Sequence, residues 1–131
     1  VADDSGLVVP ELNFEPGIYS ARYAGLNASD KENRDKLIQK LNDLSVSSLD
    51  AYYVCCLVGV KRHDDPMPLI SFGTIHGKVS TTSLGSGGFG YDKIFYLDEF
   101  KCSMAEMDPK LKNTISHRAE AVRDFIKKFE Y

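Results

Sequence analysis

The sequence contains no long hydrophobic run. Its longest apolar stretch extends from Ala51 to Val60, whereas a membrane-spanning helix needs about 20 consecutive apolar residues. The first residues also lack the charged and apolar regions of a secretory signal peptide. We therefore expect neither a membrane span nor secretion, and we expect the protein to work in the cytoplasm.

The sequence has no excess of positive charge. It carries 16 Lys and Arg against 19 Asp and Glu, which gives a formal net charge of -3. This balance disfavours general electrostatic binding to a nucleic-acid polymer. A bound phosphate would instead need a local cluster of hydrogen-bond donors.

Cysteine and histidine are few and do not form metal-binding motifs. Cys55 and Cys56 are neighbours that should point to opposite faces of a strand, and Cys102 stands apart. No C-x-x-C or H-E-x-x-H spacing occurs, which argues against zinc. The P-loop motif and the dinucleotide fingerprint are also missing, so P-loop and Rossmann folds are disfavoured.

The residues that are present suffice for a core, because 43% of them are hydrophobic. We expect one α/β domain over residues 1–131, with strands and helices in one continuous unit. Helical spacing and capping residues predict helices over 29–44 and 116–129, and a brief helix capped by Ser103 and Glu106. Strands are predicted over 51–61, 69–79 and 94–97, the first two as an antiparallel hairpin.

Finer features of these elements can also be predicted. The strand over 51–61 is nearly all apolar, which predicts burial on both faces. Gly73 and Gly77 should permit a bulge or sharp bend in the next strand. The last helix should bury a face formed by Val122, Phe125, Ile126 and Phe129.

Two adjacent carboxylates, Asp3 and Asp4, are the last residues of what reads as the end of a strand whose beginning is absent. Carboxylate oxygens suit a hard cation such as Mg²⁺. Side chains alternate along a strand, so one of the pair should reach a cleft as ligand and base while the other caps backbone amides. The alternative is that Asp3 to Gly6 form an ordinary turn.

A glycine-rich loop ends in Phe89, Gly90, Tyr91 and Asp92. Backbone without side chains, two aromatic rings and a carboxylate would suit a flat base stacked on an aromatic ring. The alternative is a mobile hairpin tip with buried aromatics.

Cationic and donor groups gather before and at the start of the predicted last helix. They are Lys112, Asn113, Ser116, His117 and Arg118. Unpaired backbone N–H groups at a helix start also favour an acceptor-rich ligand. The alternative for His117 is a surface or capping role.

These segments, in this order, resemble the inosine triphosphate pyrophosphatase family, the XTP/dITP diphosphatases. The matching strings are Ala2-Asp3-Asp4-Ser5-Gly6-Leu7, Pro16-Gly17-Ile18-Tyr19-Ser20-Ala21-Arg22-Tyr23-Ala24-Gly25, Gly88-Phe89-Gly90-Tyr91-Asp92, and Lys112-Asn113 leading to Ser116-His117-Arg118. The resemblance implies an elongated mixed sheet with flanking helices, two lobes around a central cleft, and a homodimer. It implies hydrolysis of ITP, dITP and XTP to the monophosphate and pyrophosphate.

The same resemblance implies roles for individual residues. Asp4 would be the proton acceptor, Asp3 and Asp4 would hold Mg²⁺, and Ser5 would touch the substrate. Phe89, Gly90, Tyr91 and Asp92 would frame the base. Lys112 would contact the nucleotide, and His117 with Arg118 would recognise the six-position of the purine.

The chain departs from the family pattern at its front and at one loop position. The family's N-terminal phosphate-gripping loop and a following Glu ligand are not found, so the chain resembles the C-terminal two-thirds of a family protein. Lys93 stands where the family usually has proline. A purine-nucleotide-binding module without catalysis is therefore the first alternative, and an oligomerising structural domain is the second.

Overall fold

A computed structural model describes residues 1–130. Along the chain the elements are β1 (Ala2–Val9), η1 (Pro10–Leu12), β2 (Glu15–Pro16), η2 (Gly17–Arg22), α1 (Asp30–Asp43), β3 (Ser48–Gly59), β4 (Leu69–Ser80), β5 (Phe95–Leu97), β6 (Cys102–Ser103), η3 (Met104–Glu106), α2 (Pro109–Ile115) and α3 (His117–Phe129). The strands form one sheet in the order β2-β1-β3-β4-β5-β6. Within residues 1–130, no helix has the length and apolar character needed to cross a membrane.

The sheet is built on a long β3–β4 hairpin, as predicted. Its register is continuous from Ser48 opposite Ser80 to Gly59 opposite Leu69, without a bulge at the two β4 glycines. The expected bulge is therefore wrong. All five strand pairings among the described residues are antiparallel, so the predicted mixed sheet is also wrong. The order and composition of the elements along the chain do not show whether neighbouring strands pair parallel or antiparallel.

β1 runs straight through the acidic pair. Asp3, Asp4 and Ser5 pair in register with Leu57, Cys56 and Cys55 of β3. The prediction that a strand ends at Asp4 is wrong, and so is the alternative of a turn from Asp3 to Gly6. On its other edge β1 pairs with β2 only at Val8 and Val9.

Burial on β3 alternates along the strand. Alternate residues, among them Ala51, Tyr53, Cys55 and Leu57, are buried, while the residues between them are half-buried or exposed. The expected burial of both faces of this strand is wrong. An apolar run does not show whether one or both faces of a strand pack against other elements. The buried face carries the functional residues described below.

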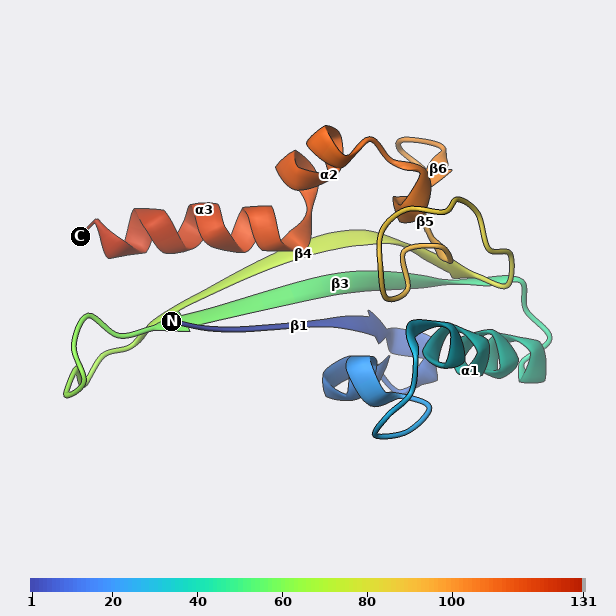
Figure 1. The fold of residues 1–131 in the computed structure, drawn as a ribbon, viewed down its shortest axis with the longest axis horizontal. Coiled ribbons are helices and arrows are strands. Elements are labelled where there is room, and N and C mark those ends of the chain that lie inside the picture. The colour runs from blue at the N-terminus through green and yellow to red at the C-terminus, as the bar shows by residue number, and fades with distance from the viewer. Residues whose placement is uncertain (131) are drawn as a thin grey trace.

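Helices cover the two ends of the sheet (Figure 1). α1 begins after Ser29, close to the predicted start of this helix; Ser29 forms a capping box with Glu32 that was not predicted, and the helix buries Leu37 and Leu41 in the main core. α3 packs against β3 and β4 and agrees with its predicted bounds.

The buried face of α3 differs from the prediction. It centres on Ala121, with Phe125 half-buried, while Val122, Ile126 and Phe129 are 39%, 52% and 53% exposed. The helix approaches the sheet so closely that only a small residue, Ala121, fits between them.

Candidate functional site

The glycine-rich loop lies over the buried face and has fixed contacts. The Gly90 amide donates to Asp30 Oδ2 at 2.9 Å, and its carbonyl accepts from Arg34 Nη1 at 2.8 Å. Both partners belong to α1. Gly88 has a φ of 69° and lies against the Asp92 carboxylate, where a side chain would collide. This bonding distinguishes the loop from a loose hairpin tip.

Asp92 directs its carboxylate into the protein. Only 5% exposed, it accepts from Tyr53 Oη at 3.0 Å, the Phe89 amide at 3.1 Å and Lys112 Nζ at 2.7 Å. Three donors therefore already bond to the Asp92 carboxylate, which holds the loop and Lys112 in place. That Asp92 helps to frame a base stays a prediction.

Lys112 and Phe89 form one wall of the site. Lys112 comes from α2, a separate helix that the sequence reading merged with the approach to α3. Its ammonium lies 4.8 Å from the centre of the Phe89 ring. Phe89 itself is 74% exposed, which leaves an aromatic face open to solvent.

His117 and Arg118 begin α3 over the sheet. The His117 ring stacks on Tyr53, with 4.9 Å between centroids and 14° between planes. Burial, and secondarily the positive charge of Arg118, lowers the pKa of His117 to about 4, so the ring is neutral at pH 7. Arg118 pairs with Asp3 across the gap to β1, at 3.2 Å.

The predicted substrate-binding residues gather around two adjoining hollows. The first, about 200 Å³, contains seven of them: Ser5, Phe89, Gly90, Tyr91, Asp92, Lys112 and His117. The second, about 380 Å³, adds Arg118 and shares Ser5, Phe89, Lys112 and His117 with the first. Segments at the start, middle and end of the chain therefore share one site.

Two buried polar atoms in this site have no hydrogen-bond partner among residues 1–130. They are Ser5 Oγ and His117 Nδ1, and both residues line both hollows. Buried polar groups in proteins are normally bonded. Two unbonded groups in one hollow are typical of a site that receives a polar ligand.

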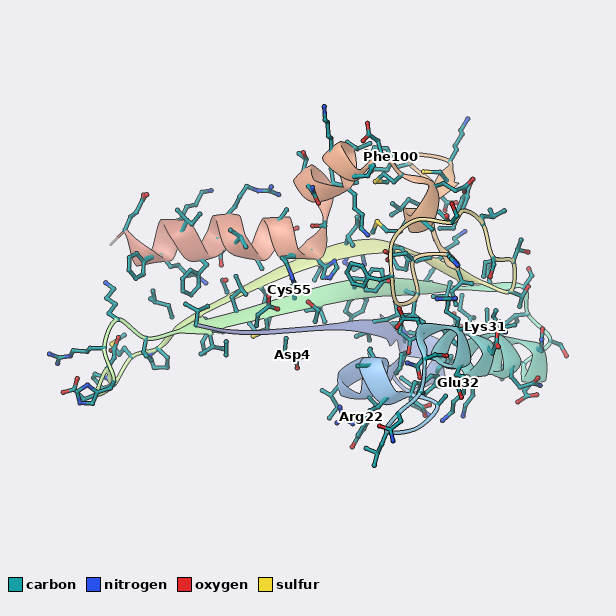
Figure 2. All side chains as sticks on the ribbon, viewed as in Figure 1. Asp4, Arg22, Lys31, Glu32, Cys55 and Phe100 are labelled. Atoms are coloured by element: carbon teal, nitrogen blue, oxygen red, sulfur yellow. The ribbon has the colours of Figure 1, made fainter. Side chains whose placement is uncertain are left out.

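Asp4 lies on the other face of β1. It is opposite Cys56, whereas Asp3 and Ser5 are opposite Leu57 and Cys55 on the buried face. Figure 2 shows the Asp4 side chain pointing away from α3. Asp4 is exposed and lines neither hollow.

The acidic pair does not fit a shared Mg²⁺ site. The two side chains leave opposite faces of the strand, and Asp3 is engaged by Arg118. Residues 1–130 contain no group of three or more His, Cys, Asp or Glu that could hold a metal ion.

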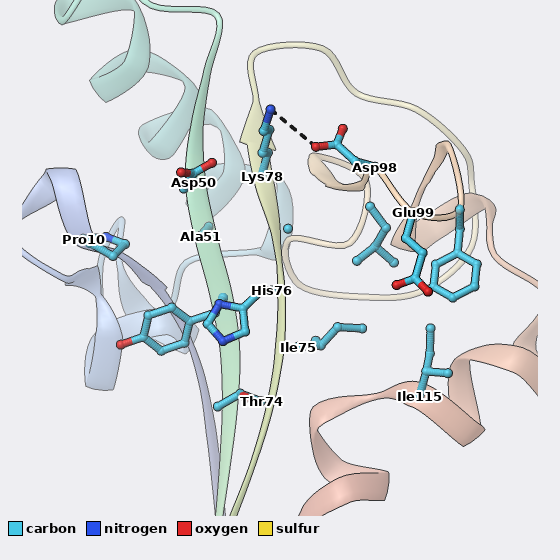
Figure 3. A pocket seen from close by; sticks show the side chains of 14 residues that line it. Pro10, Asp50, Ala51, Thr74, Ile75, His76, Lys78, Asp98, Glu99 and Ile115 are labelled. Atoms are coloured by element: carbon cyan, nitrogen blue, oxygen red, sulfur yellow. Dashed lines mark ion pairs between the residues drawn. The ribbon is translucent and has the colours of Figure 1, made fainter.

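A larger hollow, about 720 Å³, lies elsewhere, between β4 and the segment that follows β5 (Figure 3). Its polar lining includes His76 and the ion pair of Lys78 with Asp98. None of the predicted site residues lines it.

Comparison with known proteins identifies the family to which this fold belongs. The model of the Ham1 family matches residues 1–128. The chain belongs to the Ham1 family. It is 52% identical to a dITP/XTP pyrophosphatase of Legionella pneumophila over 122 residues, which are 93% of this chain and 63% of that protein. It is 45% identical to a dITP/XTP pyrophosphatase of Vibrio cholerae over 130 residues, 99% of this chain and 65% of that protein.

Solved structures agree with the assignment. A HAM1 protein from Coxiella burnetii superposes with a TM-score of 0.92 at 40% identity, covering 99% of this chain and 66% of that one. The Staphylococcus aureus Ham1 protein gives 0.82 at 39% identity, covering 99% and 67%. The predicted family resemblance is confirmed, and the chain spans about 63% of the length of the Legionella relative. Ham1 proteins typically use a divalent metal.

Sequence reasoning missed Tyr53, which supports both His117 and Asp92. The adjacent Tyr52 carries the same hydroxyl, so no signal in the sequence singled out Tyr53. Asp30 and Arg34 were also missed, because their bonds to Gly90 join residues far apart in the chain.

Proposed function

We propose that this Ham1 chain forms the nucleotide site of a pyrophosphatase that hydrolyses ITP, dITP and XTP in the cytoplasm. The observation that carries the proposal is the shared hollow with unbonded Ser5 Oγ and His117 Nδ1. The names of the relatives, dITP/XTP pyrophosphatases at 45–52% identity, support it. A homodimer remains a prediction from the family resemblance.

The purine would lie in the hollow against Phe89. Neutral His117 can donate one hydrogen bond, and Arg118 is a permanent donor. Inosine and xanthosine carry an oxygen acceptor at the six-position, whereas adenosine carries an amino donor there. An unpaired buried donor costs about 1–3 kcal/mol, so adenine would be disfavoured.

The triphosphate would pass the edge of β1 towards Asp4. β2 pairs with β1 only at Val8 and Val9, and η2 approaches β1 at Gly6, so the proposed path passes the edge from Ala2 to Asp4. Water would attack the α-phosphorus as Asp4 accepts its proton, and the bond from the α-phosphorus to the bridging oxygen would break to release pyrophosphate. This step uses a carboxylate that is exposed and free of ion pairs among residues 1–130.

The second candidate is a nucleotide-binding module without catalysis. It is favoured by the position of Asp4 outside the hollows and by the absence of a shared Asp3–Asp4 metal site in residues 1–130.

Asp4→Asn and Asp3→Asn form a matched pair that tests the proposal, because they remove equal charge from opposite faces of one strand. We expect Asp4→Asn to lower pyrophosphate release from ITP by about 10²–10⁴-fold while calorimetry with IMP changes little. Asp3→Asn should instead weaken IMP binding, because Arg118 loses the ion pair that holds it in position.

Two outcomes would count against catalysis by this site. IMP binding without pyrophosphate release from the unsubstituted chain favours the binding module. Equal efficiency on ATP and ITP contradicts the assigned recognition, and undiminished turnover by Asp4→Asn contradicts its role as base.

A further inference from the structure

We propose that Ser71 and Gly73 of β4 are positioning residues that set the height of α3 above the sheet and thereby place His117 and Arg118 at the hollow. The effect on nucleotides rests on the proposed function. The effect on the helix does not.

Gly73 lies directly beneath the first turn of α3. A Cβ added there would overlap the carbonyl oxygen of His117 and come within 2.5 Å of the Ala121 amide nitrogen. Both are backbone atoms of the helix, so no side-chain rotation relieves the overlap. The first turn of α3 can lie this low because residue 73 has no side chain.

Ser71 holds the same turn from below. Its side chain is fully buried, and its hydroxyl donates to the Ala121 carbonyl oxygen at 2.9 Å. Ala121 is itself fully buried against the sheet. Gly73 thus admits the first turn of α3, and Ser71 bonds to the backbone of Ala121, where that turn ends.

The height of α3 matters because of what lies next to Gly73. In register across three strands, Ser5 is opposite Cys55, and Cys55 is opposite Gly73. A helix raised over Gly73 would therefore move His117 away from Ser5, and these two residues carry the unbonded polar atoms. It would also separate the His117 ring from Tyr53, on which it stacks at 4.9 Å.

Two other glycines of the hairpin provide matched controls. A Cβ at Gly77, also on β4, would come within 2.5 Å of the Tyr96 carbonyl oxygen and within 2.9 Å of the Phe95 ring, which packs on Tyr53, but it would not touch α3. A Cβ at Gly59 would come within 2.5 Å of the Phe125 ring, near the other end of α3. Both alanine variants add a close contact inside the protein, but neither contact involves the first turn of α3.

The test is Gly73→Ala beside Gly77→Ala and Gly59→Ala, read by NMR of His117 and by calorimetry. In Gly73→Ala we expect the His117 ring signals to lose the shift caused by Tyr53 and its pKa to rise from about 4 towards the ordinary value. Affinity for IMP should fall about tenfold, but affinity for the monophosphate of unsubstituted purine riboside by less than about threefold. Gly59→Ala should leave the His117 signals and both affinities unchanged, and Gly77→Ala, which reaches His117 only through Phe95 and Tyr53, should change them less than Gly73→Ala does.

Unchanged His117 signals in folded Gly73→Ala would overturn the proposal, as would equal changes in the controls. Should Gly73→Ala not fold, Ser71→Ala removes only the hydroxyl bond and is expected to shift His117 in the same direction. An unsubstituted chain that binds no purine nucleotide would refute the proposed function, while the NMR result still decides the positioning role.

Discussion

Replacing Asp92 with asparagine tests whether the buried ion pair holds the site together. Asp92 and Lys112 meet at 2.7 Å with side chains 6% and 20% exposed. Breaking a buried pair costs about 3–5 kcal/mol in general. Because Lys112 retains some access to water, we expect the lower end, about 3 kcal/mol.

Bond counting gives a similar figure. The charged bond from Lys112 contributes about 1.5–3 kcal/mol, and each of the neutral bonds from Tyr53 and Phe89 about 0.5–1.5 kcal/mol. Phe89 and Lys112 both donate to Oδ2, so an asparagine oxygen in that place keeps both bonds but loses the negative charge that strengthens the one from Lys112, and the Tyr53 hydroxyl then faces the amide group. The expected total loss is therefore about 1.5–3 kcal/mol.

Urea unfolding measures this loss, and the surface pair Lys31–Asp35 is the control. That pair has the same 2.7 Å separation, but its side chains are 76% and 57% exposed. Asp35→Asn should cost less than about 0.5 kcal/mol. A double-mutant cycle of Asp92→Asn with Lys112→Met should give a coupling of about 2 kcal/mol. A loss below about 1 kcal/mol, or a coupling near zero, would refute the role given to the pair.

Three further measurements test the same architecture. Because the pKa of His117 is low in the folded protein, His117 of the unfolded chain binds a proton at a higher pH than His117 of the folded chain. The free energy of unfolding should therefore decline as pH falls from about 6.5 to about 4. Denaturation at several pH values measures this slope, and His117→Phe should remove the part that His117 contributes. Ser29→Ala removes a complete capping box with Glu32 and should cost about 1 kcal/mol in urea unfolding, whereas no loss would show that α1 does not depend on its cap. Tyr53→Phe removes one donor to Asp92 and should cost about 1 kcal/mol, and a neutral result would argue against that bond.

Local signals predicted the parts of the fold that local physics determines. The Ser103 capping box forms as its spacing indicates, and α1 begins after Ser29, close to its predicted start. The β3–β4 hairpin follows from two apolar runs around a turn. α2 was missed although Asp108 caps it and Pro109 occupies its first position, a pair of signals that would have found it.

The remaining features depend on contacts between distant segments. Gly73 was interpreted as a site of bending. No residue near it in the sequence indicates that α3, which begins more than forty residues later, packs directly on it. The bonds of Asp92 to Tyr53 and Lys112 are equally remote. The glycine-rich loop and the cationic cluster before α3 were singled out from residue chemistry, and Ser5 from the family resemblance alone, whereas their arrangement follows from the sheet register.

The alternation of side chains along β1 has an evolutionary consequence. Ser5 and Asp3 serve the side of the strand that faces α3, and Asp4 serves the reverse side. Under the proposed function, recognition of the base and hydrolysis of the phosphate chain therefore depend on residues on opposite faces of the same strand. Mutations that broaden or narrow the accepted bases can then accumulate without weakening hydrolysis, so new substrate preferences can arise within an otherwise unaltered enzyme.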